Sequence, residues 1–248
     1  MKIGFVCLHY GSDYLAFSIK SIYDSVDKIL VAYSEMPSHG HASTLKNPDS
    51  KHACYAAAFA FGDPKNKIQW IEGKWGSEGA HRNIAFEMYP KADLISVVDA
   101  DEIWHPEQFA AMQEWCLKQP TRQFKTALRT PWRSFNWICD DPMRPDRFFR
   151  LNQPMGSISY TPNEIGMFYH FGYARKPEHI KYKLSCHGHK NELKNNWFEE
   201  KFMAWSPTNN IGDLHPTCKG FWHAKPFDKN LLPKIMREHP YWNLNIIC

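Results

Sequence analysis

Short apolar runs alternate with amphipathic segments over the first 100 residues, and this alternation restricts the chain to a small set of folds. The run at 94–98, Leu-Ile-Ser-Val-Val, is short and rich in β-branched residues, which predicts a buried central strand. Similar runs predict three more strands, at 2–8, 28–34 and 67–72. Helical patterns separate these strands, at 14–23, 52–61 and 78–89. Strands that alternate with helices in this way form a parallel sheet with right-handed crossovers.

The pattern changes in the second half of the chain. A helix predicted over 106–118 is followed by short β-type runs that indicate a mixed sheet, at 124–129, 147–151, 157–160 and 167–173. Two further helices are predicted, at 178–186 and 192–205. We therefore expect an α/β core over residues 1–175 and a helical C-terminal extension over 176–248 that packs on it.

Composition excludes several classes of protein. The chain is 43% hydrophobic and 23% charged, which is typical of a soluble globular protein. Its net charge of +4 is too small to indicate a nucleic-acid partner but suits an anionic small-molecule substrate. No apolar stretch reaches the roughly 20 residues of a membrane span, so we expect none. Seven cysteines without a CxxC pair indicate a reducing, cytoplasmic compartment.

An acidic motif follows the strand predicted at 94–98. Asp99 and Asp101 are two residues apart, so in an extended chain their carboxylates project to the same side. Carboxylates that lie so close repel each other unless they share a proton or a cation, and Mg²⁺ and Mn²⁺ prefer such oxygen ligands. The alternative is that one aspartate caps the next helix, but Pro106 fits the first helical position and places that cap near His105. The motif therefore predicts a metal site.

Four segments are predicted to meet at one crevice beyond the carboxyl ends of the strands, namely Tyr10-Gly11, Glu35, the loop 73–79 and residues 99–101. Arg82 lies in the first turns of the helix predicted from residue 78, where free backbone N–H groups favour an anion. We expect Arg82 to meet a phosphate group; the alternative is an ordinary arginine on a helix surface. The sequence lacks the GxxxxGK[ST], GxGxxG, HExxH and GxSxG motifs of other enzyme classes.

The βαβ opening, the DxD-type motif Asp99-Ala100-Asp101 and Arg82 in the preceding helix resemble the GT-A fold glycosyltransferases that use nucleotide sugars, closest to the family two-like group. The resemblance covers roughly residues 1–175 and implies a Rossmann-like mixed sheet flanked by helices. It also implies a UDP-, GDP- or dTDP-linked sugar donor, with Mn²⁺ or Mg²⁺ bridging the diphosphate to the aspartates. Asp101 would be the main metal ligand, and Asp99 would lie nearer the ribose and the metal.

The same resemblance implies further site residues. A histidine late in the core often adds a metal ligand, and His170 is the best candidate by position, with His223 as second choice. The alternative for His170 is a strand histidine that bonds to backbone. Arg175 would meet the donor phosphates. Tyr10 and Gly11 would also contact the donor.

The chain departs from the family pattern after the second strand, where Ser34-Glu35-Met36-Pro37-Ser38-His39 replaces an acidic run that holds the nucleoside. Glu35 would take that role. Inverting relatives need a carboxylate base for the acceptor hydroxyl, and the candidates are Glu164, placed first, then Asp140 and Asp141.

These observations predict a glycosyltransferase that transfers a hexose or related sugar to a hydroxyl of a glycan or other acceptor. The alternatives are a metal-dependent sugar nucleotidyltransferase, and a non-catalytic carbohydrate-binding protein on the same fold. A separate alternative concerns four residues that could hold a structural zinc ion, Cys186, His189, His215 and Cys218, although their spacing matches no standard zinc motif.

Overall fold

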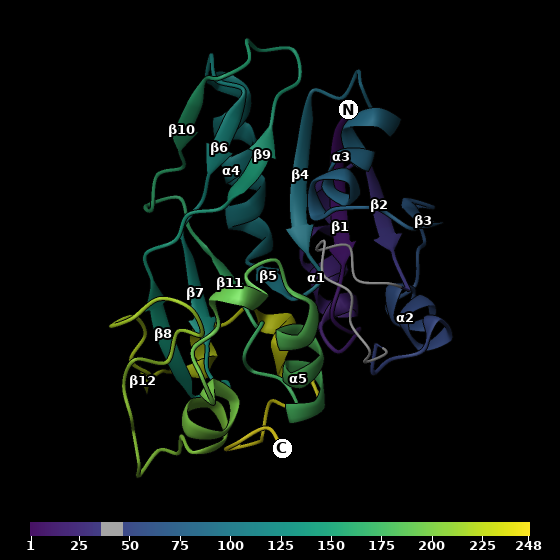
Figure 1. Ribbon diagram of the computed structural model, residues 1–248. Helices are drawn as coiled ribbons and strands as arrows, with labels where there is room; N and C mark the ends of the chain where they lie inside the picture. Colours follow the sequence, from purple (N-terminus) through teal and green to yellow (C-terminus); the bar gives the residue numbers. More distant parts are fainter. Residues whose placement is uncertain (36–46) are drawn as a thin grey trace.

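The computed structural model describes residues 1–35 and 47–248 and contains two β-sheets. The larger sheet has the strand order β10-β6-β9-β4-β1-β2-β3 (Figure 1). Its parallel half consists of β1 (Lys2–Leu8), β2 (Lys28–Tyr33), β3 (Ile68–Glu72) and β4 (Leu94–Asp99). The other half contains β6 (Gln123–Lys125), β9 (Asp146–Phe149), which is antiparallel to both of its neighbours, and β10 (Ile158–Tyr160). The Rossmann-like mixed sheet predicted from the sequence is confirmed.

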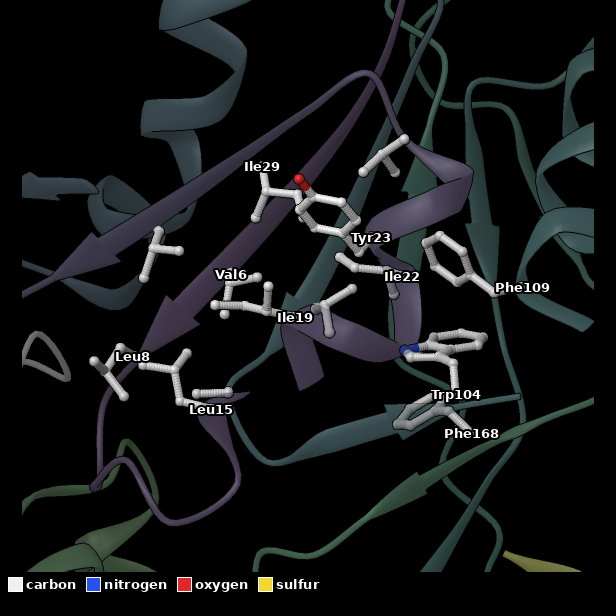
Figure 2. Packing of buried hydrophobic residues seen from close by; sticks show 14 of the residues in the cluster. Val6, Leu8, Leu15, Ile19, Ile22, Tyr23, Ile29, Trp104, Phe109 and Phe168 are labelled. Atoms are coloured by element: carbon white, nitrogen blue, oxygen red, sulfur yellow. The ribbon is translucent and has the colours of Figure 1, made fainter. Parts of the chain in front are cut away.

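Helices cover both faces of the parallel half. Alternate side chains of β1 point to opposite faces, so Val6 and Leu8 pack with α1 (Leu15–Ile22), as Figure 2 shows. The helices α2 (Lys51–Ala58) and α4 (Pro106–Lys118) pack in the same cluster. On the other face, Phe5 and Cys7 pack with α3 (Glu78–Met88).

The close approach of α1 explains one glycine in β1. A Cβ atom on Gly4 would lie 2.8 Å from Cδ1 of Ile22, so only glycine lets the helix lie this near the strand.

The smaller sheet has the order β12-β8-β7-β11-β5. Its strands are β5 (Glu102–Trp104), β7 (Leu128–Pro131), β8 (Trp137–Asp141), β11 (Phe168–His170) and β12 (Lys225–Pro226). The run predicted at 124–129 is therefore divided between the sheets, because the pairing of β6 with β9 shifts after Phe124 and the chain then leaves the larger sheet. Only Ala100 and Asp101 separate β4 in one sheet from β5 in the other.

Residues 176–248 begin with α5 (Pro177–Cys186), close to the helix predicted at 178–186. The helix predicted at 192–205 is wrong in extent, since Phe198–Met203 forms a short π-helix and Glu192 belongs to a separate 3₁₀ turn. Asn196 explains the late start, because its φ of 52° is left-handed and cannot belong to a right-handed helix. The remaining helical segments are short 3₁₀ turns, at Lys190–Glu192, Lys229–Leu231 and Lys234–Glu238. The division of the chain at residue 175 stays a prediction.

The C-terminal segment joins the rest of the protein through an aromatic cluster. Trp132, directly after β7, is fully buried and lies edge-on to Trp197, Trp205 and Trp222. Most of the tryptophans in this half are therefore core residues. In the described part of the chain no helix is long and apolar enough to cross a membrane.

Candidate active site

A cavity of about 270 Å³ lies where β1 and β4 end. Crevices at the carboxyl ends of parallel strands are the usual ligand sites of such sheets. The lining side chains come from the loop after β1, from α3, the β4–β5 turn, β11 and the chain after it, α5, and two later loops. Among the residues predicted for the site, six line this one cavity: Tyr10, Arg82, Asp99, Asp101, His170 and Arg175.

Asp99 is the last residue of β4 and is paired with two arginines. Its neighbour in the sheet is Cys7, and the backbone N–H of Ala100 donates to the carbonyl of Cys7 at 2.9 Å. Nη2 of Arg82 lies 2.9 Å from one carboxylate oxygen of Asp99, and Nη2 of Arg147 lies 3.0 Å from the other. Burial alone would raise the pKa of Asp99, but the two guanidinium groups outweigh it and hold the pKa well below its usual range. Asp99 is therefore a fixed anion.

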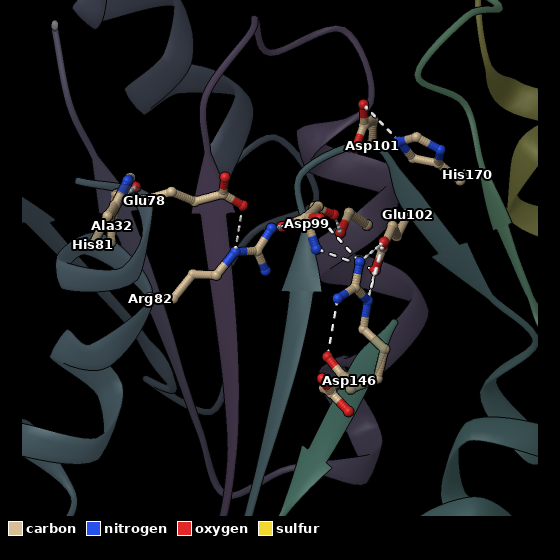
Figure 3. Close-up of polar contacts among 11 residues, drawn as sticks. Ala32, Glu78, His81, Arg82, Asp99, Asp101, Glu102, Asp146 and His170 are labelled. Carbon is tan, nitrogen blue, oxygen red and sulfur yellow. Dashed lines mark hydrogen bonds and ion pairs between the residues drawn. The ribbon is translucent and has the colours of Figure 1, made fainter. Parts of the chain in front are cut away.

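This pairing belongs to a longer row of alternating charges, which Figure 3 shows crossing from α3 over β4 to β9. Glu78 accepts from Nε of Arg82 at 2.9 Å, one helical turn away. At the other end, Nε of Arg147 donates to Oε2 of Glu102 at 2.8 Å. Burial raises the pKa of Glu102, and the guanidinium of Arg147, which pairs with both Glu102 and Asp99, opposes this shift.

Asp101 lies in the turn after β4, where the smaller sheet holds its backbone. The pairing of β11 with β5 sets His170 opposite Glu102, and Phe171 N–H donates to the carbonyl of Asp101 at 2.8 Å. Oδ2 of Asp101 lies 3.6 Å from Nε2 of His170 (Figure 3) and 3.5 Å from Nη2 of Arg175. That oxygen is buried and accepts no hydrogen bond in the described structure. Burial opposes ionisation of Asp101, but His170, Arg175 and Lys183 lower its pKa.

Asp101 and His170 are the residues of the cavity that could hold a hard divalent cation between them. Burial lowers the pKa of His170 to about 4, so its imidazole is neutral near pH 7, which is the metal-binding form. Asp99 is less accessible as a ligand, since both of its oxygens face arginines. Of the described residues, one group of three has ligand atoms within 4.8 Å of one another, and it is Cys7, His9 and Asp99. Burial raises the pKa of the Cys7 thiol, which disfavours the thiolate that a metal needs.

Arg175 lies deeper in the protein than the sequence indicates. Its side chain is 1% exposed, and its Nη2 lies 3.4 Å from a carboxylate oxygen of Asp13 as well as near Asp101. The guanidinium also sits over the ring of Tyr14 at 5.5 Å. Arg175 thus connects the loop after β1 to the acidic turn.

Other predicted residues lie outside the cavity. Glu164 is exposed in the chain before β11, and Asp141 at the end of β8 accepts from the backbone N–H of Met143 at 2.9 Å. Neither Glu164 nor Asp141 lines the cavity. Asp140 does not line it either, since it is exposed and pairs with Lys225.

The nucleoside candidate, one of the two donor-contact residues and the histidine of second choice do not line the cavity. Glu35 lines a separate hollow beside β2 and β3. Gly11 lies against the ring of His179, since a Cβ atom on Gly11 would be 2.5 Å from Cδ2 of His179. His223 lies 3.3 Å from the amide of Asn210.

The four residues considered for zinc do not form one site in the described structure. Cys186 is buried with its thiol 3.2 Å from the carbonyl of Tyr182, whereas Cys218 is exposed. His189 and His215 line the cavity instead.

Two cationic residues of the site were not predicted. Lys183 lines the cavity from α5, where it shares a buried face with His179, Ile180 and Cys186. A lysine at helical spacing among buried residues was the available signal. Arg147, which pairs with Asp99, is buried because β9 lies inside the sheet between β4 and β6.

No protein-family model and no curated protein matches the sequence. Similar solved structures include residues 1–349 of S. aureus TarS, with a TM-score of 0.43 and 11% identity over 85% of this chain and 74% of that one. A 4-diphosphocytidyl-2C-methyl-D-erythritol synthase from Anaerococcus prevotii has a TM-score of 0.41 and 9% identity over 73% and 93%. An active-site mutant of LgtC has a TM-score of 0.34 and 9% identity over 62% and 58%. With TM-scores below 0.5, the fold assignment rests on strand order and the function on the geometry of the cavity.

Proposed function

We propose that this protein is a metal-dependent glycosyltransferase that moves a sugar from a nucleotide-diphosphate donor to an acceptor hydroxyl. The observation that carries the proposal is the buried Oδ2 of Asp101, which accepts no hydrogen bond in the described structure and faces His170 at 3.6 Å. A buried carboxylate oxygen that accepts no hydrogen bond costs free energy even beside the charge of Arg175, and a cation held jointly with the imidazole would remove that cost.

We propose Mn²⁺ or Mg²⁺ as the cation, with Asp101 and His170 as the residues that hold it. When bound, the ion stabilises the negative charge that develops on the phosphate leaving group. Asp99 keeps its charge through Arg82 and Arg147, and by the sequence resemblance it lies toward the ribose.

The size and charge of the cavity support a diphosphate as the occupant. Its volume of about 270 Å³ is small for a complete nucleotide sugar, since sites for whole small molecules measure roughly 300–1,000 Å³. The N-terminus of α3 borders the cavity, with Glu78 and Arg82 in the lining. Backbone N–H groups at such a terminus favour phosphate oxygens. The diphosphate therefore fits the cavity, and the nucleoside and the acceptor extend outside it.

The test is a thermal-shift panel of UDP-, GDP- and dTDP-sugars with and without Mn²⁺. We expect at least one donor to raise the Tm only when Mn²⁺ is present, because binding to the native state stabilises it. Asp101→Asn should abolish this shift. Asp140→Asn is the matched control, since Asp140 is exposed outside the cavity, and it should keep the shift. Equal shifts in the wild type and in Asp101→Asn would contradict the assignment of Asp101.

Product analysis separates the proposal from its rival. A glycosyltransferase releases a nucleoside diphosphate from the stabilising donor. Release of pyrophosphate from a nucleoside triphosphate and a sugar phosphate would show a nucleotidyltransferase instead.

A further inference from the structure

Lys183 lines the cavity, and in the described part of the chain its ammonium group has no hydrogen-bonded partner. Its residue is only 7% exposed, and the side chain lines the cavity from α5. Within residues 1–35 and 47–248, no acceptor is hydrogen-bonded to its Nζ and no carboxylate forms an ion pair with it at 4 Å or less. An ammonium group carries three donors, so all three are available to a ligand.

Two aromatic rings and a glycine fix the position of this ammonium group. Nζ lies 4.5 Å from the centre of the Tyr173 ring and 5.1 Å from that of Tyr10, which are cation–π distances. A Cβ on Gly172 would lie 2.6 Å from Nζ of Lys183 and 2.6 Å from Nε2 of His170. Both nitrogens therefore border the space directly above the Cα atom of Gly172.

This position makes Lys183 favourable for an anion and unfavourable for a lone cation. Oδ2 of Asp101 lies 3.6 Å from Nε2 of His170, and Nη2 of Arg175 lies 3.5 Å from the same oxygen. A divalent ion at Asp101 and His170 would thus meet two positive side chains, Arg175 and Lys183. A diphosphate in the same cavity would bring negative charge to Lys183 and remove this repulsion.

We propose that Lys183 binds the diphosphate in this cavity and, from the same position, opposes the binding of a divalent cation on its own. The inference rests on the proposed function and adds to it. Metal and diphosphate would then bind with positive coupling, because the bound diphosphate neutralises the positive charge at Lys183 that opposes the cation, and thermodynamic linkage makes the effect reciprocal. Lys183 binds the diphosphate leaving group, and its charge also determines how strongly the binding of the diphosphate and of the metal ion depend on each other.

The test uses the full chain and three calorimetric titrations, with MnCl₂ alone, with pyrophosphate in the presence of EDTA, and with pyrophosphate in the presence of Mn²⁺. For Lys183→Met we expect pyrophosphate without metal to bind about 10-fold more weakly, through loss of a charge-assisted hydrogen bond. We expect Mn²⁺ alone to bind about 5-fold more tightly, the lower end of couplings between sites in proteins. A general structural defect would weaken both.

Control variants isolate the charge of Lys183. Lys181→Met removes a lysine from the same helix, but Lys181 is exposed and lies over Phe198, so it should behave as the wild type. Lys183→Arg keeps the charge and should retain the coupling. Lys183→Gln replaces Lys183→Met if the latter does not fold, with the same expected changes.

Two results would overturn the proposal. If wild-type protein binds pyrophosphate and Lys183→Met binds it equally well, the role of Lys183 is refuted and the proposed function stands. If wild-type protein binds neither Mn²⁺ nor pyrophosphate, alone or together, both proposals fail.

Discussion

Replacing Gly172 by alanine tests the packing of the proposed metal site with a single methyl group. The added Cβ would lie 2.6 Å from Cε1 and Nε2 of His170 and from Nζ of Lys183. Ordinary contact between heavy atoms needs about 3.5 Å, so both the imidazole and the ammonium group must move away from the methyl group by about 1 Å. The φ of Gly172 is outside the left-handed region, so the effect comes from lost space alone.

The expected effect on binding is larger than the effect on folding. Metal–ligand distances tolerate deviations of about 0.2 Å, so a shift of about 1 Å in His170 should weaken joint binding of Mn²⁺ and pyrophosphate by at least about 10-fold. Overpacking of this kind costs about 1–3 kcal/mol of folding free energy. For a chain of this size that lowers the Tm by about 2–12 °C.

Calorimetry and thermal unfolding measure the two effects on the same samples. Gly76→Ala is the matched control, since a Cβ there meets no atom within 4 Å and the backbone φ is outside the left-handed region. It should bind Mn²⁺ and pyrophosphate as the wild type does. If Gly172→Ala binds both as tightly as Gly76→Ala with an unchanged Tm, the reasoning from space at residue 172 is refuted.

Three further predictions concern stability. Arg147→Met leaves Glu102 buried without its guanidinium partner and should lower the free energy of unfolding in urea by about 3–5 kcal/mol. Adding Glu102→Gln should recover part of that loss. Equal unfolding free energies for the single and the double variant would contradict this pairing. The pKa of His239 is lowered by burial to about 4, below the unfolded value of about 6.5. Stability contributed by the neutral ring is therefore present above pH 6.5 and is lost as the pH falls toward 4. His239→Phe should make the free energy of unfolding depend less on pH between pH 7 and 5. An unchanged slope against pH would argue against a buried neutral ring. Trp132→Ala empties the centre of the aromatic cluster and should cost about 3–5 kcal/mol; a loss below about 1 kcal/mol would mean that the cluster is loosely packed.

The sequence predicted the parallel half of the larger sheet because each of its strands is a continuous apolar run. Leu94–Asp99 and Lys2–Leu8 could be identified by composition alone, and the position of Asp99 and Asp101 at one end followed from strand direction. His170 was placed near Asp101 by resemblance to relatives, and the pairing of β11 with β5 gives the physical reason for its position.

Features that depend on contacts distant in sequence could not be predicted. The burial of Arg147 depends on β6, which pairs with β9 from the far side and makes it an internal strand. Lys183 enters the cavity because α5 packs against residues more than 80 positions earlier, among them Tyr10. The short segments at 124–129 and 192–205 gave ambiguous patterns, and local backbone geometry at Asn196 decided the second of them.

In the second half of the chain, single strands or pairs of consecutive strands belong alternately to the larger and the smaller sheet. After β4 the backbone visits the smaller sheet with β5, returns for β6, leaves again for β7 and β8, and returns for β9 and β10 before ending in β11 and β12. No single cut along the backbone separates one sheet from the other. The molecule should therefore lose its structure in one cooperative step, and its many pairings between distant segments should make refolding slow.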